Sequence, residues 1–266
     1  MTFFVYFGEI MKEFLGFGGY ERTPEGAYSW QHLLLVGIVL AAMIGIAVWL
    51  GLVNRHKDAK SKNRVLIWTA ILIDALEIFK IVVMCMRSDD PSTAWHGLLP
   101  LFLCSIQLIT IPVAAFTRGI VKDAALDFVL IFGILGAILG TIGAAQNYNA
   151  YPVLSLDNVV SALTHSISGF ASLYIAISGM ASMKKRNIPI TYSILGVFCG
   201  AAFITNKILD ANYMFLESDD GTPYSLLTSL VGGNPVLYAI GVVVLFLIYI
   251  TGFYLIFRLC TKKSRK

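Results

Sequence analysis

Seven long apolar stretches constrain the fold of this chain more than any other feature of its sequence. A helix needs about 20 predominantly apolar residues to cross a bilayer core about 30 Å thick. The stretches that meet this length cover residues 31–53, 64–86, 97–117, 124–146, 158–182, 189–210 and 234–259. Only 14% of the 266 residues are charged, which is too few to cover the surface of a soluble domain. The sequence therefore predicts an all-α polytopic membrane protein, a seven-transmembrane-helix bundle.

Lysine and arginine predict the orientation of this bundle. Basic residues follow the first, third and fifth stretches and also end the chain, whereas the alternate loops are poor in base and the loop over 211–234 is acidic. Short loops rich in Lys and Arg stay on the cytoplasmic side of a membrane. We therefore expect the N-terminus outside and the C-terminus in the cytoplasm, in a multi-pass protein of the bacterial cytoplasmic membrane. The expected partners of the basic loops are anionic membrane lipids rather than nucleic acid, and the sequence indicates no oligomeric state.

Three regions follow from the same pattern. Residues 1–30 are too short and too charged to span a bilayer, and their aromatic residues can gather on one face of an amphipathic helix lying on the outer interface. The alternative is a disordered terminus. Residues 31–260 form a single membrane domain, and residues 261–266 are a basic cytoplasmic tail.

Polar side chains inside the predicted spans gather near one depth. If the third span begins near residue 97, Cys104 lies about 10 Å below the outer surface at 1.5 Å per residue, and His165 of the fifth span lies at the same depth. Ionisable groups at such depths usually face the bundle interior. We expect a polar cavity open to the outside. Its predicted binding residues are Glu77, Lys80, Gln107, Asn206, Lys207, Asp210 and His32.

Cys104 and His165 are the candidate catalytic residues. A histidine within hydrogen-bond reach converts a cysteine thiol into a nucleophilic thiolate, which can accept an acyl group and pass it on. Ser105, Gln107 or Asn206 could orient the imidazole or donate to an oxyanion. Two alternatives stay open: Cys104 and His165 are packing residues, or the charged groups form structural pairs such as Glu77–Lys80 or Asp74–Lys207. The sequence has no paired cysteine or metal-ligand spacing, and it predicts no metal and no cofactor.

Several stretches resemble the YwaF-like bacterial membrane proteins, which are similar to the animal transmembrane protein 164 acyltransferases. They are Tyr28 to Leu33, Leu99 to Ser105, the region around His165, Asn212 to Leu216, and Gly221 to Leu227. The resemblance implies transfer of acyl chains between phospholipids, with the cysteine and histidine roles falling on Cys104 and His165. The sequence departs from the family at Phe102, where relatives carry histidine, and at Gln31, where glutamate is common.

Three functions therefore compete. The first is a membrane-embedded, thiol-dependent lipid acyltransferase or lipid hydrolase with an outward-facing site. The second is a small-solute transporter or binding protein that uses the polar cavity without covalent chemistry. Inverted repeats and broken spans, which many transporters carry, are not detectable here. The third is a seven-span sensor or assembly factor, for which the short C-terminal tail provides no output domain.

Overall fold

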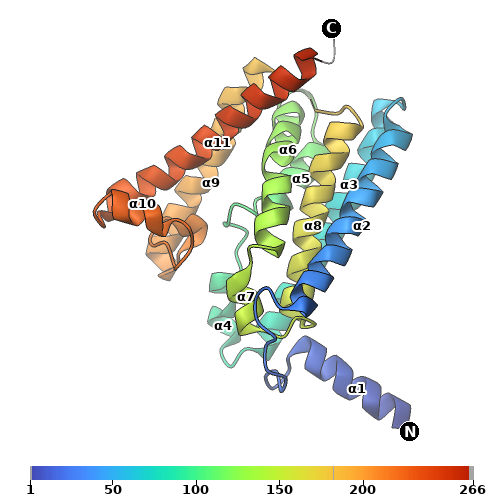
Figure 1. Cartoon of the computed structure of the whole chain (residues 1–266), viewed down its shortest axis with the longest axis vertical. Coiled ribbons are helices and arrows are strands. Elements are labelled where there is room, and N and C mark those ends of the chain that lie inside the picture. Colours follow the sequence, from blue (N-terminus) through green and yellow to red (C-terminus); the bar gives the residue numbers. More distant parts are fainter. Residues whose placement is uncertain (1, 182, 264–266) are drawn as a thin grey trace.

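Runs of apolar helix-forming residues separated by short polar turns give an all-helical chain (Figure 1). The computed structural model describes residues 2–181 and 183–263, and every regular element in those residues is a helix. The α-helices are α1 (Thr2–Leu15), α2 (Trp30–Asn54), α3 (Ala59–Arg87), α4 (Pro91–Ala94), α5 (Gln107–Phe116), α6 (Gly119–Thr141), α7 (Ala145–Ala150), α8 (Leu156–Ile177), α9 (Ile188–Leu209), α10 (Ser225–Leu230) and α11 (Pro235–Lys263). Single 3₁₀ turns occur at η1 (Trp95–Gly97), η2 (Lys185–Asn187) and η3 (Tyr213–Phe215).

Helices α2, α3, α5, α6 and α8 form one bundle in which α8 packs against the other four. Small residues let these helices approach closely, as is usual between membrane helices. A Cβ atom built on Gly133 of α6 would lie 2.6 Å from the Ser168 carbonyl oxygen of α8, and one on Gly169 of α8 would lie 2.5 Å from Met43 Sδ of α2. Gly133 and Gly169 are therefore packing residues at helix crossings.

Helices α9 and α11 form a second group, inclined to the bundle and joined to it at α6 (Figure 1). A buried carboxylate supports this junction. Asp127 of α6 is fully buried and accepts hydrogen bonds from the Met183 amide at 3.0 Å, the Asn187 side chain at 2.7 Å and the Tyr254 hydroxyl at 3.0 Å. A buried carboxylate with several donors is well solvated by the protein. Asp127 thus ties α6, the 183–187 turn and α11 together.

Five helices of the described chain are long and apolar enough to cross a membrane, namely those over Trp30–Asn54, Gly119–Ala150, Leu156–Ile177, Lys185–Leu209 and Pro235–Cys260. The prediction of an all-α membrane protein is confirmed, but this count is lower than the seven predicted spans. Helix α3 is 29 residues long but carries Asp74, Glu77 and Lys80. Helix α5 has only ten residues, because the chain before it is not α-helical from residue 98 to residue 106. The prediction of one continuous helix over 97–117 is therefore wrong for its first half.

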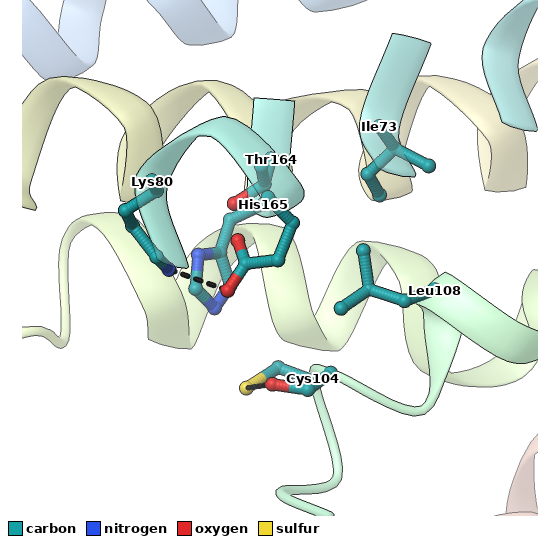
Figure 2. A pocket seen from close by; sticks show the side chains of 8 residues that line it. Ile73, Lys80, Cys104, Leu108, Thr164 and His165 are labelled. Atoms are coloured by element: carbon teal, nitrogen blue, oxygen red, sulfur yellow. Dashed lines mark hydrogen bonds and ion pairs between the residues drawn. The ribbon is translucent and has the colours of Figure 1, made fainter. Parts of the chain in front are cut away.

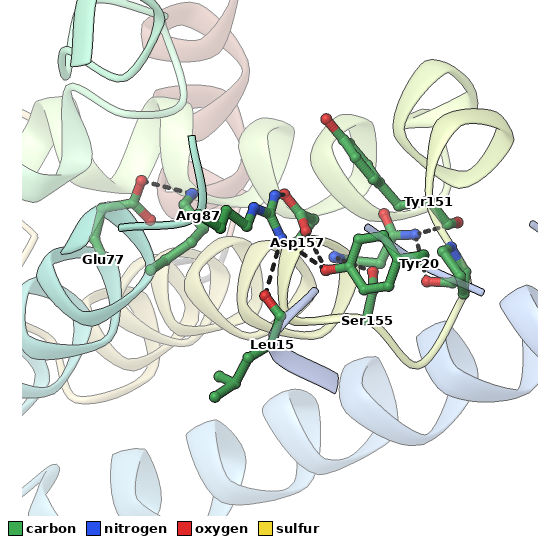
Figure 3. Close-up of polar contacts among 10 residues, drawn as sticks. Leu15, Tyr20, Glu77, Arg87, Tyr151, Ser155 and Asp157 are labelled. Atoms are coloured by element: carbon green, nitrogen blue, oxygen red, sulfur yellow. Dashed lines mark hydrogen bonds and ion pairs between the residues drawn. The ribbon is translucent and has the colours of Figure 1, made fainter. Parts of the chain in front are cut away.

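The N-terminal segment is helical over α1, and the chain that follows it is tied to the bundle (Figure 3). Arg87, at the end of α3, pairs with Asp157 of α8 at 2.5 Å and donates to the Tyr20 hydroxyl at 2.8 Å. Tyr20 in turn donates to Asp157 at 2.6 Å. Burial, followed by this hydrogen bond, raises the pKa of Tyr20 to about 12. Residues 264–266, half of the predicted basic tail over 261–266, lie outside the described residues.

Candidate functional site

A small pocket lies where α3, α5, α8 and the turn before α5 meet (Figure 2). It has about 310 Å³ of empty space, part of it open to solvent, and carries an unusual density of reactive and charged groups for the interior of an apolar bundle. Its lining residues are Ile73, Glu77, Lys80, Cys104, Ser105, Leu108, Thr164 and His165. Four of the nine predicted site residues, Cys104, His165, Glu77 and Lys80, therefore face one space.

His165 is held in a defined tautomer by its own helix. Its Nδ1 atom lies 2.7 Å from the Ser161 carbonyl oxygen, one turn earlier in α8. A carbonyl can only accept, so Nδ1 carries the proton and Nε2 of the neutral ring is the free base. The ring also lies against the backbone of α6, because a Cβ built on Gly140 would stand 1.8 Å from His165 Cδ2. The imidazole is thus oriented by α8 and seated on α6.

Cys104 lies in the non-helical turn that precedes α5 rather than inside a helix. Its side chain lines the same pocket as that of His165 (Figure 2). The Ser105 hydroxyl is 4.0 Å from the Cys104 sulfur. Gly136 of α6 lies behind the cysteine, and a Cβ built there would make an ordinary contact of 3.7 Å with Cys104 Cβ. The thiol therefore shares one pocket with a histidine base and a serine hydroxyl.

Tyr213 of η3 holds the turn that carries Cys104. Its hydroxyl donates to the His96 carbonyl at 2.5 Å and accepts from the Leu99 amide at 3.0 Å. The Tyr213 ring packs on Phe102, with ring centroids 5.0 Å apart. Asn206 of α9 fixes Tyr213 in turn, because its carboxamide accepts from the Tyr213 amide at 2.7 Å and donates to the Tyr213 carbonyl at 3.1 Å. Asn206 thus reaches the site only through Tyr213.

Glu77 and Lys80 form an ion pair at 2.6 Å along one face of α3. Both side chains are largely buried, with exposed fractions of 14% and 16%. The Lys80 ammonium lines the same pocket as His165 (Figure 2). Lys207, by contrast, pairs with Glu217 at 2.6 Å near the surface. Of the two structural ion pairs that the sequence suggests, Glu77–Lys80 is therefore present. Lys207 pairs with Glu217 and not with Asp74.

The remaining predicted binding residues lie elsewhere. His32 is fully buried: its Nδ1 accepts from the Tyr28 amide at 2.9 Å and its Nε2 donates to the Thr141 carbonyl at 3.2 Å. Both ring nitrogens are thus occupied between α2 and α6. Gln107 is fully buried at the start of α5 and accepts from Thr110 at 3.0 Å. Asp210 is the exposed C-cap of α9. In the described part of the chain, no three His, Cys, Asp or Glu side chains gather as metal ligands would.

Sequence reasoning missed three residues that shape the site. Ser161 fixes the tautomer of His165, Gly140 makes room for its ring, and Tyr213 anchors the cysteine turn. The sequence does single out Gly140, because it belongs to a run of glycines spaced by three or four residues in and just after α6. That spacing indicates close packing but not what packs there. Tyr213 is more than 100 residues from Leu99 in the sequence, and no local pattern relates the two.

Comparison with known proteins gives one match. A family model described as the TMEM164 family matches residues 27–254, which is most of the chain. No curated protein and no solved structure matches the sequence. The matched range begins just before α2 and ends within α11, so it includes every residue of the pocket.

Proposed function

The chain belongs to the TMEM164 family, and we propose that it is a thiol-dependent lipid acyltransferase or lipid hydrolase that reacts through Cys104 and His165. One observation carries this proposal: a cysteine thiol and a histidine with a fixed tautomer share one buried pocket with charged and hydroxyl groups. The same two residue types form the nucleophile and base of many acyl-transfer sites.

In the proposed reaction the Cys104 thiol passes its proton to Nε2 of His165, and the sulfur attacks the ester carbonyl of a lipid. The tetrahedral intermediate collapses, the ester C–O bond breaks, and the leaving lysolipid alcohol takes the proton from His165. The acyl chain is then a thioester on Cys104. A second alcohol, or water in a hydrolase, gives its proton to His165 and attacks the thioester, which releases the new ester or the free acid and restores the thiol.

The other pocket groups have proposed supporting roles. The Ser105 hydroxyl is placed to donate to the oxyanion, because it lines the pocket beside the sulfur. Glu77 and Lys80 supply opposite charges to this pocket, and we assign them to the polar part of the lipid.

We also propose seven membrane crossings for the chain. Helix α3 presents apolar side chains outward, including Trp68, Ile78 and Met86, while Glu77 and Lys80 face the pocket. Such a helix can cross a bilayer with its charges turned inward. Residues 98–116 would cross as a broken span, with the cysteine turn enclosed by the bundle. The two chain ends lie at opposite ends of the molecule, which fits an N-terminus outside and a C-terminus in the cytoplasm (Figure 1).

The test is acyl transfer by purified protein in vesicles that contain a phospholipid with a deuterated acyl chain and an unlabelled lysophospholipid. Wild-type protein is expected to produce doubly acylated lipid carrying the label, or labelled free acid if water is the acceptor. Cys104→Ser and His165→Ala should each lose at least about 100-fold in rate with unchanged thermal stability. Cys199→Ser, which removes a buried cysteine away from the pocket, is the matched control and should keep its rate. Full activity in both pocket variants would refute the proposal.

The alternative is a small-solute transporter that uses the Glu77–Lys80 pair. Two observations favour this function: an ion pair inside an apolar bundle that faces a cavity, and the non-helical segment before α5, since many transporters carry broken spans. The two functions separate in the same vesicles: uptake of solutes that is lost in Glu77→Gln, together with full activity of Cys104→Ser, would favour transport.

A further inference from the structure

A second pocket lies between the beginning of α9 and the last turns of α11, far along the sequence from Cys104. It has about 690 Å³ of empty space and is open to the surface. Two basic side chains, Lys185 and Arg258, face it, and its walls include Ile188, Pro189 and Leu255. None of the residues that line it is acidic. We propose that this pocket binds the phosphate head group of an anionic phospholipid.

The basic residues of the loop before α9 do not all point into this pocket. Lys184 and Arg186 both turn towards Asp123 of α6, at 3.2 and 3.5 Å. Lys185, between them in the sequence, instead lines the pocket with Arg258 of α11. Two cations from different elements thus converge on one concave space, and each attracts an anionic lipid with about 1 kcal/mol near a membrane surface.

The floor of the pocket is already fixed by internal hydrogen bonds. The Tyr254 hydroxyl donates to the buried Asp127 and lies 3.1 Å from the Thr191 hydroxyl. The oxygens of Asp127 also accept from the Met183 amide and the Asn187 side chain. A ligand therefore meets the two cations at the rim and an ordered floor. The N-terminus of the 22-residue α9 adds partial positive charge at the same place.

The surroundings favour a lipid over a soluble anion. Apolar side chains of both helices continue from the pocket along the outer surface, with Val197 70%, Ile248 61% and Ile256 64% exposed. In a membrane protein such a surface faces acyl chains. A molecule with phosphate at one end and alkyl chains at the other fits the cations and this surface together. Basic pockets between membrane helices are known to recognise anionic head groups in this way.

The experiment compares lipids at fixed protein and detergent concentration. Protein in micelles is titrated with phosphatidylglycerol, phosphatidylcholine or soluble glycerol phosphate, and bound lipid is counted by native mass spectrometry while Tm is recorded. Phosphatidylglycerol should remain bound and raise Tm, and the other two should not. In Lys185→Gln/Arg258→Gln the apparent affinity for phosphatidylglycerol should fall by about 30-fold, since each charge contributes about fivefold.

The matched control is Lys184→Gln/Arg186→Gln, which removes the same number of charges from adjacent positions that face Asp123. It should keep its affinity for phosphatidylglycerol. An equal loss in both double variants would overturn the site in favour of general surface charge. Equal binding of glycerol phosphate would overturn the lipid assignment. If the pocket double variant does not fold, each single variant is measured instead, with a loss of about fivefold expected and an unchanged affinity contradicting the proposal.

Discussion

Gly140 of α6 lies directly beneath the imidazole of His165, so that a Cβ built on it would stand 1.8 Å from Cδ2 and 2.2 Å from Nε2 of the ring. No side chain can occupy position 140 while His165 keeps this position. Even a methyl group at position 140 would therefore displace Nε2, the nitrogen that would act as the base. The position of the ring is therefore determined by α6 as well as by the Ser161 carbonyl of its own helix.

Gly140→Ala should therefore impair the site through His165. We expect the ring to be displaced, the protein to lose about 1–3 kcal/mol of stability through overpacking, and acyl transfer to fall by about 100-fold. A substrate-independent measurement is the rate at which iodoacetamide alkylates Cys104, read by peptide mass spectrometry; this rate should also fall. Gly45→Ala is the matched control, because Gly45 lies in α2 with nothing within 4 Å of a built Cβ. Equal behaviour of the two variants would show that Gly140 does not position the ring.

Tyr213→Phe should loosen the turn that carries Cys104. The change leaves the His96 carbonyl and the Leu99 amide without their shared partner, which should cost about 1–3 kcal/mol of stability. Thermal unfolding measures this loss, and the activity should decline with it. Tyr192→Phe removes a hydroxyl of α9 that bonds the exposed Thr251 of α11, and it should change stability by less than about 1 kcal/mol. A Tyr213→Phe protein as stable and active as wild type would contradict the role given to this hydroxyl.

Asp157→Asn should destabilise the protein strongly, because it leaves Arg87 without its charge partner in a largely buried site. The two side chains are only 5% and 13% exposed. Breaking such a pair by removing one member typically costs about 3–5 kcal/mol. The comparison is Glu13→Gln, which breaks the more exposed Glu13–Arg22 pair and should cost about 0–1 kcal/mol. Similar unfolding temperatures for the two variants would show that the buried Arg87–Asp157 pair contributes no more stability than the exposed Glu13–Arg22 pair.

Tyr20, which bonds both Arg87 and Asp157, should make the stability of the protein depend on pH. Its pKa is raised from 10.0 to about 12, chiefly by burial, so folding favours the neutral phenol. This contribution to stability is complete below pH 10 and is lost as the pH rises through 12. The stability difference between wild type and Tyr20→Phe should therefore narrow between pH 10 and pH 12. Unfolding temperatures recorded at half-unit steps measure it, and a difference that stays constant over this window would contradict the raised pKa.

The long helices could be predicted from the sequence because apolar length alone specifies them. The expected spans at 31–53, 189–210 and 234–259 correspond to α2, α9 and α11. Each boundary agrees to within one residue except the end of α11, which the structure places at Lys263. The broken segment before α5 could not be predicted in this way. Its residues are as apolar as those of a helix, and its turn is held by Tyr213, a residue more than 100 positions away.

The predicted depth of each residue in the membrane identifies some of the residues that line the pocket, but it also selects residues that lie elsewhere. Cys104 and His165 were expected at one level, and they line one pocket. Asn206 and Lys207 were expected at a similar level, yet Asn206 binds η3 and Lys207 binds Glu217. Depth specifies where a residue lies along a helix but not which way the helix is turned. His32 differs for another reason, since its two ring nitrogens are satisfied by backbone groups that no sequence pattern identifies.

Whether Cys104 carries the acyl chain between donor and acceptor is tested most directly by incubating the protein with labelled phospholipid alone and mapping the label by mass spectrometry. We predict an acyl group on Cys104, released by neutral hydroxylamine as a thioester is, and absent from His165→Ala. Transfer of the label to lysophospholipid at the wild-type rate by Cys104→Ala would contradict it.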